Sequence, residues 1–416
     1  MTARELARRV LERIERDRAW ATPTLDGELA RANLDDRDRR LASELVYGVL
    51  RHRARIDRAL AAHADLSRTP PRVVVALRVA AYQLLLLDRV PPYAAVDDAV
   101  GAARASGGQK LAGFANAVLR KLGPGKEPAL PPPGPDRIAA EFSLPRWIVD
   151  ELVAVGGEQY AAAFAQSAPL VARANRLKSS RASVMELLAT AGAQVRAIEL
   201  APEAFAIDSG LGDPSRSPSF QTGLWTVQDA GAQLVALAAA PQPGQRVLDA
   251  CAGVGGKSTH LAELAGDRAT IIAADRSTTK LALGAETAKR LGLSSIESIA
   301  CDLVDPNAPL GNAYDLIVLD APCSGLGVLR RHPDAKWRLV PGDVPRLAEI
   351  QARLLDAVAT RLASTGTLVY SVCTFTRAEG PDQARAFAAR SGMRIVDEHR
   401  TWPPDADAFY LARFAR

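Results

Sequence analysis

Two cysteines and an aspartate in this chain have the residue types and the spacing for covalent chemistry. Asp320 and Cys323 lie in the run Asp-Ala-Pro-Cys-Ser-Gly at 320–325, and Cys373 lies in the run Tyr-Ser-Val-Cys-Thr at 370–374. A thiolate is an unusually good nucleophile when its pKa is lowered locally. These side chains therefore indicate a reaction in which sulfur attacks a substrate atom.

The elements before both cysteines are expected to bring them together. Tyr314–Leu319 and Gly366–Tyr370 are apolar, β-branched stretches that predict buried strands. In an open parallel sheet the carboxyl ends of the strands face the ligand crevice. The other two cysteines, Cys251 and Cys301, are interpreted as small buried side chains. No Cys-x-x-Cys pair is present, so we expect neither a metal site nor a disulfide framework.

A glycine-rich turn follows another predicted strand, Arg246–Ala250. Glycines let the backbone approach a ligand, and the helix that follows favours negative charge at its start. A phosphate loop is excluded because Cys251 stands where that pattern requires glycine. Asp275 and Asp302 end the next two strands, where acids bind ribose hydroxyls and an adenine amino group. We therefore favour an adenosyl cofactor over a plain tight connection.

The C-terminal half alternates between strand and helix patterns, which predicts a parallel sheet covered on both faces. The tail Phe409–Phe414 is expected to add an edge strand. The predicted strands are Arg246–Ala250, Thr270–Ala274, Ile296–Ala300, Tyr314–Leu319 and Thr367–Tyr370, and the helices between them are Ser258–Ala265, Lys280–Leu291 and Arg346–Leu362.

The N-terminal part is different. Residues 1–122 carry helical periodicity throughout, and 123–135 form a linker rich in proline and glycine. Residues 136–223 contain further helices and a small strand–helix–strand unit, and 224–416 hold the alternating pattern. A chain of 416 residues is expected to form two or three such domains.

Charge and composition narrow the class of protein. Residues 1–125 hold 22 Lys and Arg against 15 Asp and Glu, while the whole chain carries a net charge of only +5. Arginine forks suit phosphate backbones, so we expect RNA contact there, the alternative being a solvated helix surface. No apolar run reaches membrane-spanning length, and the first residues lack a signal peptide's apolar segment, so we expect a cytoplasmic protein with no membrane partner. The arginines concerned are Arg37, Arg39, Arg40, Arg51, Arg53, Arg55 and Arg58.

Several blocks of the chain resemble the Nop/Sun RNA cytosine-5 methyltransferases, and within that family the bacterial 16S ribosomal RNA enzymes with a NusB-like N-terminal domain. The resemblance spans essentially the whole chain. It implies an all-α NusB-like RNA-binding domain at 1–122, an RNA-binding subdomain at 136–223 and a Rossmann-like methyltransferase domain at 224–416. It is carried by the two cysteine runs, by Arg-Arg-His-Pro-Asp-Ala-Lys-Trp at 330–337, by Arg-Ala-Asn-Arg at 173–176 and by Asn-Ala-Val-Leu-Arg at 116–120.

The resemblance also implies an activity. Cytosine carbon 5 accepts a methyl group only after a thiolate has attacked carbon 6. A base must then remove the carbon 5 proton, and an acid near ring nitrogen 3 stabilises the adduct. The resemblance assigns Cys373 as nucleophile and Cys323 to product release, and the chain supplies Asp320 as the acid. It implies a monomer acting on 16S ribosomal RNA and not on DNA. It implies S-adenosylmethionine as cofactor, bound by Cys251, Ala252, Gly253, Val254, Gly255, Gly256, Lys257, Asp275, Asp302 and Asp320.

Alternatives remain open at this point. Proline–cysteine is the nucleophile motif of DNA cytosine-5 methyltransferases, so the two thiols are also considered in reversed roles. Transfer RNA is a second possible substrate, and a non-catalytic RNA-binding protein of the antitermination type is a second class. Two positions depart from the family pattern: Val254 replaces a proline in the cofactor turn, and Gly380 replaces an asparagine after Cys373.

Overall fold

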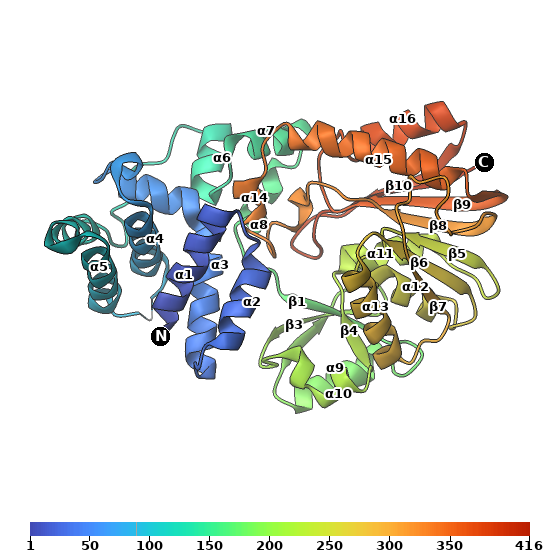
Figure 1. The fold of residues 1–416 in the computed structure, drawn as a ribbon, viewed down its shortest axis with the longest axis horizontal. Helices are drawn as coiled ribbons and strands as arrows, with labels where there is room; N and C mark the ends of the chain where they lie inside the picture. Colours follow the sequence, from blue (N-terminus) through green and yellow to red (C-terminus); the bar gives the residue numbers. More distant parts are fainter. Residues whose placement is uncertain (89) are drawn as a thin grey trace. The chain divides into compact units, whose positions relative to one another are not determined.

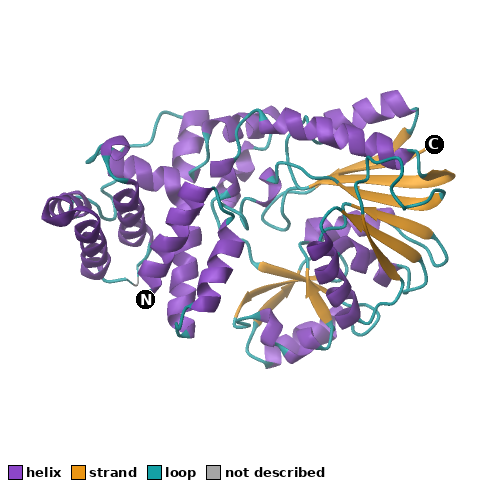
Figure 2. Cartoon of the chain, in the orientation of Figure 1, coloured by secondary structure: helices purple, strands orange, loops and turns teal. Residues whose placement is uncertain are grey.

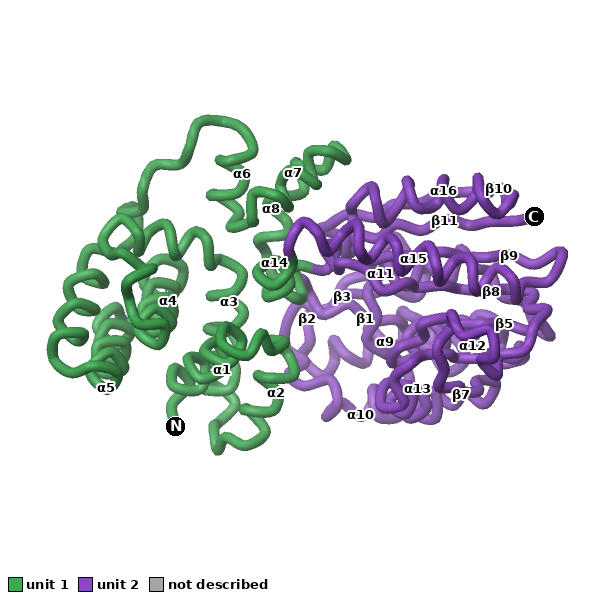
Figure 3. The backbone as a smooth tube through the Cα atoms, turned by 45° about the horizontal axis from the view of Figure 1, so that its top comes forward, with its two compact units in different colours: residues 1–167, 329–339 green, residues 168–328, 340–416 purple. Residues whose placement is uncertain are grey.

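A computed structural model describes residues 1–88 and 90–416, which form two compact units (Figure 3). The first unit consists of residues 1–167 and 329–339. The second consists of residues 168–328 and 340–416. Within the described residues, no helix combines the length and the apolar character needed to cross a bilayer.

The first unit is helical, as predicted. Its first helix begins at a capping box, in which Thr2 and Glu5 each accept a hydrogen bond from the other's backbone N–H. The apolar residues spaced along this helix are buried in a core shared with the next helices. The helix spanning Pro92–Leu119 is kinked at Gly107 and Gly108, and Gly108 has a positive φ of 74°. The helices are α1 (Ala3–Asp17), α2 (Ala21–Arg31), α3 (Asp36–Ala61), α4 (Pro71–Leu86), α5 (Pro92–Leu119), α6 (Pro135–Phe142), α7 (Arg146–Ala154), α8 (Ala161–Phe164) and α14 (Ala335–Arg338).

The segment 329–339 packs with this helical unit although it follows the strand that precedes Cys323. Trp337 Nε1 donates to the carbonyl of Leu50 at 2.6 Å, and Lys336 Nζ donates to that of Arg51 at 2.7 Å. Lys336 is buried, and burial lowers the pKa of its amine well below the usual value. Arg330 is also buried.

The expected basic face of α3 is largely absent, because most of its arginines make contacts inside the unit. Arg55 forms a two-point ion pair with Glu127, at 2.7 and 2.6 Å. Arg37 and Arg40 are exposed. The other arginines are engaged within the unit, which the sequence did not reveal because it shows their charge and not their partners. Those engaged are Arg39 with the Leu29 carbonyl, Arg51 with that of Arg330, Arg53 with Glu15 and Asp57, Arg55 with Glu127, and Arg58 with the carbonyls of Pro128 and Ala129.

The second unit contains a seven-stranded sheet in the order β10-β11-β9-β8-β5-β6-β7 (Figures 1 and 2). The five strands from β9 to β7 are parallel, while β11 pairs antiparallel with both neighbours. The order reverses between β8 and β5, which makes a switch point. The strands are β5 (Arg246–Ala250), β6 (Thr270–Asp275), β7 (Ile296–Ala300), β8 (Tyr314–Asp320), β9 (Leu362–Val372), β10 (Arg394–Arg400) and β11 (Tyr410–Ala415).

Helices cover both faces of this sheet, and side chains alternate between two cores. Leu248 and Ile317 face one core and Val247 and Leu316 the other, as period-2 strands require. Figure 1 shows α15 and α16 on one side of the sheet and α11, α12 and α13 on the other. These helices are α11 (Ala230–Ala239), α12 (Gly256–Leu264), α13 (Thr278–Leu291), α15 (Asp343–Ala359) and α16 (Pro381–Ser391).

Two details differ from the sequence-based expectation. The C-terminal strand β11 is not an edge strand, because β10, which was not predicted, pairs with its outer side. The sequence of β10 is Arg-Ile-Val-Asp-Glu-His-Arg, whose charges suit an edge and mask the strand pattern. The small strand–helix–strand unit is also larger than predicted. It is an antiparallel sheet in the order β2-β3-β1-β4, formed by β1 (Leu170–Ala174), β2 (Gln194–Ala197), β3 (Ala204–Ser209) and β4 (Trp225–Val227), with α9 (Arg181–Thr190) and α10 (Pro218–Gln221).

Candidate active site

The two cysteines expected to do chemistry lie side by side. Cys323 follows β8 and Cys373 follows β9, which is the parallel neighbour of β8. Their Sγ atoms are 3.4 Å apart, and both side chains are partly exposed. Asp320 is paired in register with Ser371, so the two loops leave the sheet at the same level. A substrate ring placed beside this pair would therefore be within reach of both sulfurs.

Asp320 connects the cysteine loops to the glycine-rich turn. Its Oδ2 accepts a hydrogen bond from Lys257 Nζ at 2.5 Å, and its Oδ1 accepts one from Ser371 Oγ at 2.8 Å. Lys257 is the second residue of α12, directly after the turn. The Lys257–Asp320 pair therefore links the carboxyl ends of β5 and β8 across the switch point.

Negative groups at this site keep the amine of Lys257 protonated near the sulfurs. Burial acts to lower the pKa of Lys257, but Asp320, Asp249 and Cys373 outweigh it and raise that pKa. Lys257 is therefore an ammonium group. The pKa of Cys323 is raised well above its usual value by its hydrogen bond to Cys373, by burial and by nearby negative charge. Cys323 is therefore a neutral thiol at rest.

The glycine-rich turn has the backbone shape of a ligand cradle. Cys251, Gly253 and Gly255 have positive φ angles of 64°, 56° and 78°. A Cβ at Gly255 would lie only 3.1 Å from the Cα of Gly284, so glycine is required there for close packing on α13. The N–H groups at the start of α12 add partial positive charge. This donor set fits a cofactor with a carboxylate and hydroxyl groups.

Asp275 holds the turn in place. Its Oδ2 accepts a hydrogen bond from Gly253 N at 2.9 Å, and its Oδ1 accepts one from Ser277 N at 2.8 Å. Each oxygen retains a lone pair for a ribose hydroxyl. Asp302, one strand further, accepts from Val304 N at 3.1 Å and pairs with the exposed Arg276. Asp320, the turn, Asp275 and Asp302 thus follow four adjacent strands.

Val254 is exposed, whereas Cys251 and Cys301 pack against the core of the sheet. Val254, which replaces the family's proline, is 53% exposed. Cys251 is partly buried against the core, and burial raises the pKa of its thiol. Cys301 packs on the same core, and burial raises the pKa of its thiol too.

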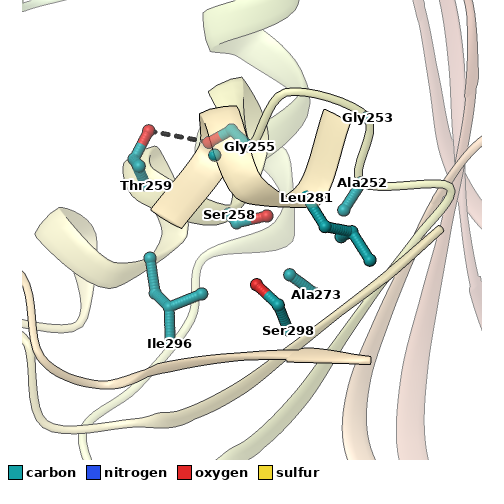
Figure 4. Close-up of a pocket in the computed structure, with 10 residues that line it drawn as sticks. Ala252, Gly253, Gly255, Ser258, Thr259, Ala273, Leu281, Ile296 and Ser298 are labelled. Carbon is teal, nitrogen blue, oxygen red and sulfur yellow. Dashed lines mark hydrogen bonds between the residues drawn. The ribbon is translucent and has the colours of Figure 1, made fainter. Parts of the chain in front are cut away.

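A small, mostly apolar pocket lies behind the turn (Figure 4). It is bounded by the turn itself, by α12 and α13, and by the face of β6 and β7. Neither of the paired cysteines lines it. Its lining residues are Ala252, Gly253, Gly255, Ser258, Thr259, Ala273, Leu281, Gly284, Ile296 and Ser298.

Two supporting contacts were not predicted from sequence. Arg173 on β1 and Glu263 on α12 are both fully buried and form an ion pair of 2.7 Å. Arg173 also contacts Gln228 and the Gly256 carbonyl, so it joins the small sheet to the start of α12. Glu379, after Cys373, is buried and accepts hydrogen bonds from the Cys323 loop. No signal in the sequence indicated these pairings, because the partners lie far apart along the chain.

Comparison with known proteins gives the family. Residues 236–414 match the family 16S rRNA methyltransferase RsmB/F, residues 1–123 match the NusB family, and residues 144–212 match the ferredoxin-like domain of RsmF/B-like methyltransferases. The chain is 36% identical to a probable ribosomal RNA small subunit methyltransferase B of Synechocystis, over 97% of this chain and 90% of that protein. It is 34% identical to the corresponding Bacillus subtilis protein, with the same coverage of both chains.

Solved structures agree with the fold. The crystal structure of PH0851 matches all of this chain and 99% of its own, with a TM-score of 0.82 at 20% identity. NSun6 from Pyrococcus horikoshii, crystallised with SFG, matches 65% of this chain and 98% of its own, with a TM-score of 0.59 at 20% identity. On the strength of its relatives, this chain belongs to the RsmB/F family of ribosomal RNA small subunit methyltransferases.

Proposed function

We propose that this methyltransferase acts on 16S ribosomal RNA and methylates carbon 5 of a cytosine through a covalent bond to Cys373. The observation that carries the proposal is the pair of sulfurs 3.4 Å apart beside the Lys257–Asp320 pair. Family membership gives the RNA substrate and the cofactor. S-adenosylmethionine, when bound, supplies an electrophilic methyl group.

The sulfur of Cys373 begins the reaction. Its thiolate forms a bond to cytosine carbon 6, and the electron pair of the carbon 5–carbon 6 double bond makes carbon 5 nucleophilic. Carbon 5 would then form a bond to the methyl group, whose bond to the cofactor's sulfur would break with both electrons staying on that sulfur. Asp320 is proposed to act as the acid near ring nitrogen 3 that stabilises the adduct, and its hydrogen bond from the Lys257 ammonium supports this by adding positive charge. A base in a helix must first be unstacked, at a cost of a few kcal/mol.

Cys323 ends the reaction. Cys323 first loses its own proton to solvent, and the resulting thiolate removes the proton from carbon 5. The carbon–hydrogen electron pair re-forms the ring double bond, and the bond between Cys373 and carbon 6 breaks with its electrons returning to sulfur. The high pKa of Cys323 makes its thiolate a strong base, which suits this step. The Lys257 ammonium beside Cys373 supports the assignment of Cys373 as the initial nucleophile.

The cofactor is proposed to lie along the ends of four adjacent strands. Backbone groups from Cys251 to Lys257 would bind its amino-acid part, and Asp275 its ribose. Asp302 would accept from the adenine amino group, and Asp320 would contact the end nearest the reacting methyl group. The positive φ angles of the turn and the lone pairs left on Asp275 support this arrangement.

The other segments are proposed to bind RNA. In this proposal, residues 1–122 form a NusB-like RNA-binding domain, 123–135 a linker and 136–223 a second RNA-binding module, and 224–416 form the catalytic domain. Only Arg37 and Arg40 among the arginines named for α3 are proposed as phosphate contacts, since they are exposed.

Alanine variants of the two cysteines test the proposal, because they should have opposite effects on the covalent adduct. Cys373→Ala should abolish methylation and form no adduct. Cys323→Ala should methylate once and remain bound to the RNA, visible as a slow band on a denaturing gel. An adduct with Cys373→Ala and none with Cys323→Ala would reverse the assignment. Bisulfite sequencing of 16S ribosomal RNA, with transfer RNA as the control, tests the substrate.

A further inference from the structure

Glu379 is a fully buried carboxylate in the loop between β9 and α16. Its Oε1 accepts hydrogen bonds from Ser324 N at 2.8 Å and Gln351 Nε2 at 3.1 Å. Its Oε2 accepts from Ser324 Oγ at 2.6 Å and Thr376 Oγ1 at 3.0 Å. Burying a carboxylate is costly unless its lone pairs are satisfied, and here four donors satisfy them.

Three of these donors come from the two cysteine loops, and the fourth, Gln351 Nε2, comes from α15. Ser324 is the neighbour of Cys323, and its hydroxyl also lies 2.9 Å from Thr374 Oγ1, the neighbour of Cys373. Gln351 Nε2 reaches the Pro322 carbonyl at 3.0 Å as well, which fixes the residue before Cys323. The carboxylate therefore sits at the centre of a buried polar network that joins the residues flanking each sulfur.

We propose that Glu379 is a positioning residue that sets the distance between Cys323 and Cys373. The inference rests on the proposed function, since that function needs both sulfurs at one substrate ring. Glu379 acts through Ser324, Thr376 and Gln351, and touches no reacting atom itself.

The donors around this position favour a carboxylate over an amide. A carboxylate offers acceptors on both oxygens, whereas the amide of glutamine offers one oxygen and one NH₂ group. In Glu379→Gln the amide oxygen can keep the bonds from Ser324 N and Gln351 Nε2, but the NH₂ group then meets the hydroxyls of Ser324 and Thr376, which must accept instead of donate, so the Thr376 hydroxyl hydrogen loses its acceptor. The network then loses hydrogen bonds and the two loops separate.

Disulfide formation measures the sulfur spacing without any methyl transfer. A disulfide bond is about 2.05 Å long, so sulfurs 3.4 Å apart need to approach by only about 1.4 Å. The full-length protein is treated with oxidised glutathione, which accepts the two electrons and is reduced to glutathione while both thiols lose their protons. Mass spectrometry then follows the Cys323–Cys373 peptide pair with time.

We expect the Glu379→Gln chain to form this disulfide at least tenfold more slowly than the original chain. Glu297→Gln is the matched control, because Glu297 is exposed on β7 and the chemical change is the same. Disulfide formation in Glu379→Gln at the rate of the control overturns the inference. Because this readout needs neither RNA nor cofactor, it holds even if the proposed methylation is wrong.

Steady-state kinetics distinguish a role of Glu379 in positioning the sulfurs from a role in stabilising the fold. In Glu379→Gln the kcat for methylation should fall about 100-fold, the loss expected from a misplacement of about 1 Å. The KM for S-adenosylmethionine should stay within twofold, since the glycine turn is not altered. A lowered melting temperature with unchanged kcat would instead indicate a structural role and contradict the proposal.

A second variant protects the test against misfolding of the first. Ser324→Ala removes one hydroxyl that contacts both Glu379 and Thr374, and it leaves the backbone N–H bond to Glu379 intact. It should slow the disulfide and lower kcat in the same direction but by less. Rates equal to those of the original chain in Ser324→Ala would overturn the inference.

Discussion

Asp320 makes polar contacts with both the helix after the glycine-rich turn and the strand before Cys373. It pairs with Lys257 and with Ser371, and it lies on the loop of Cys323. Asp320→Asn should lower the single-turnover rate by about 100- to 1,000-fold, because an amide stabilises a developing charge at the ring less well. The measurement is rapid-quench methylation with excess enzyme.

Asp315→Asn is the matched control for this experiment. Asp315 lies at the opposite end of the same strand, where its carboxylate accepts a hydrogen bond from Arg246 N at 2.8 Å. An amide oxygen accepts that bond too, so the rate should not change. Equal rates in both variants would remove Asp320 from the mechanism.

The raised pKa of Cys323 predicts a pH dependence for product release. Below that pKa, the fraction of Cys323 present as thiolate rises about tenfold for each pH unit. Decay of the adduct should therefore speed up by about this factor per unit between pH 6.5 and pH 8.5. Single-turnover experiments that follow the adduct on gels measure it. A flat profile would show that another group takes the carbon 5 proton.

At the scale of elements, the buried ion pair between β1 and α12 holds the small sheet against the cofactor helix. Arg173→Met leaves Glu263 buried without its partner, which should lower the free energy of unfolding by about 3–5 kcal/mol. Urea denaturation followed by the fluorescence of Trp225, which is buried in the small sheet, measures the loss.

The double variant tests the cause of that loss. Arg173→Met combined with Glu263→Met removes both charges, so most of the stability should return. If the double variant is as unstable as Arg173→Met, the effect comes from packing and not from an unpaired charge.

The sequence predicted those elements that depend on neighbouring residues in the chain. The strand–turn–helix after Val247 and the two cysteine loops are specified by short runs of neighbouring residues, and each lies where it was expected. Contacts across long separations were not predictable in the same way. Glu263 lies 90 residues from Arg173, and Glu379 lies 55 residues from Ser324, so each pairing depends on the fold.

Two of the strands were missed in the sequence for physical reasons. The charges of β10 hid an edge strand, and β3 consists of Ala-Phe-Ala-Ile-Asp-Ser, which is poor in β-branched residues. In the chain, segment 329–339 lies between two parts of the second unit. Trp337 nevertheless packs on the helical core of the first unit, to which this segment belongs. Sequence order alone does not reveal such an exchange.

For the whole molecule, the arginines of α3 divide into two groups with different expected effects. Arg37→Gln and Arg40→Gln should weaken RNA binding, and each should reduce the slope of log affinity against log salt by up to about one. Arg55→Gln should instead lower the melting temperature, because it breaks the pair with Glu127. Filter binding at several salt concentrations and thermal denaturation distinguish the groups. A salt slope altered equally by Arg55→Gln would contradict the division.

The central claim is that the sulfur of Cys373 bonds to a cytosine ring in RNA. Ribosomal RNA containing 5-fluorocytosine tests it directly, since fluorine at carbon 5 cannot leave as a proton does and the adduct persists. The full-length protein is incubated with this RNA and S-adenosylmethionine and digested, and the modified peptide is sequenced by mass spectrometry. The account predicts a nucleotide on Cys373. A nucleotide on Cys323, or turnover with no protein–RNA bond, would contradict it.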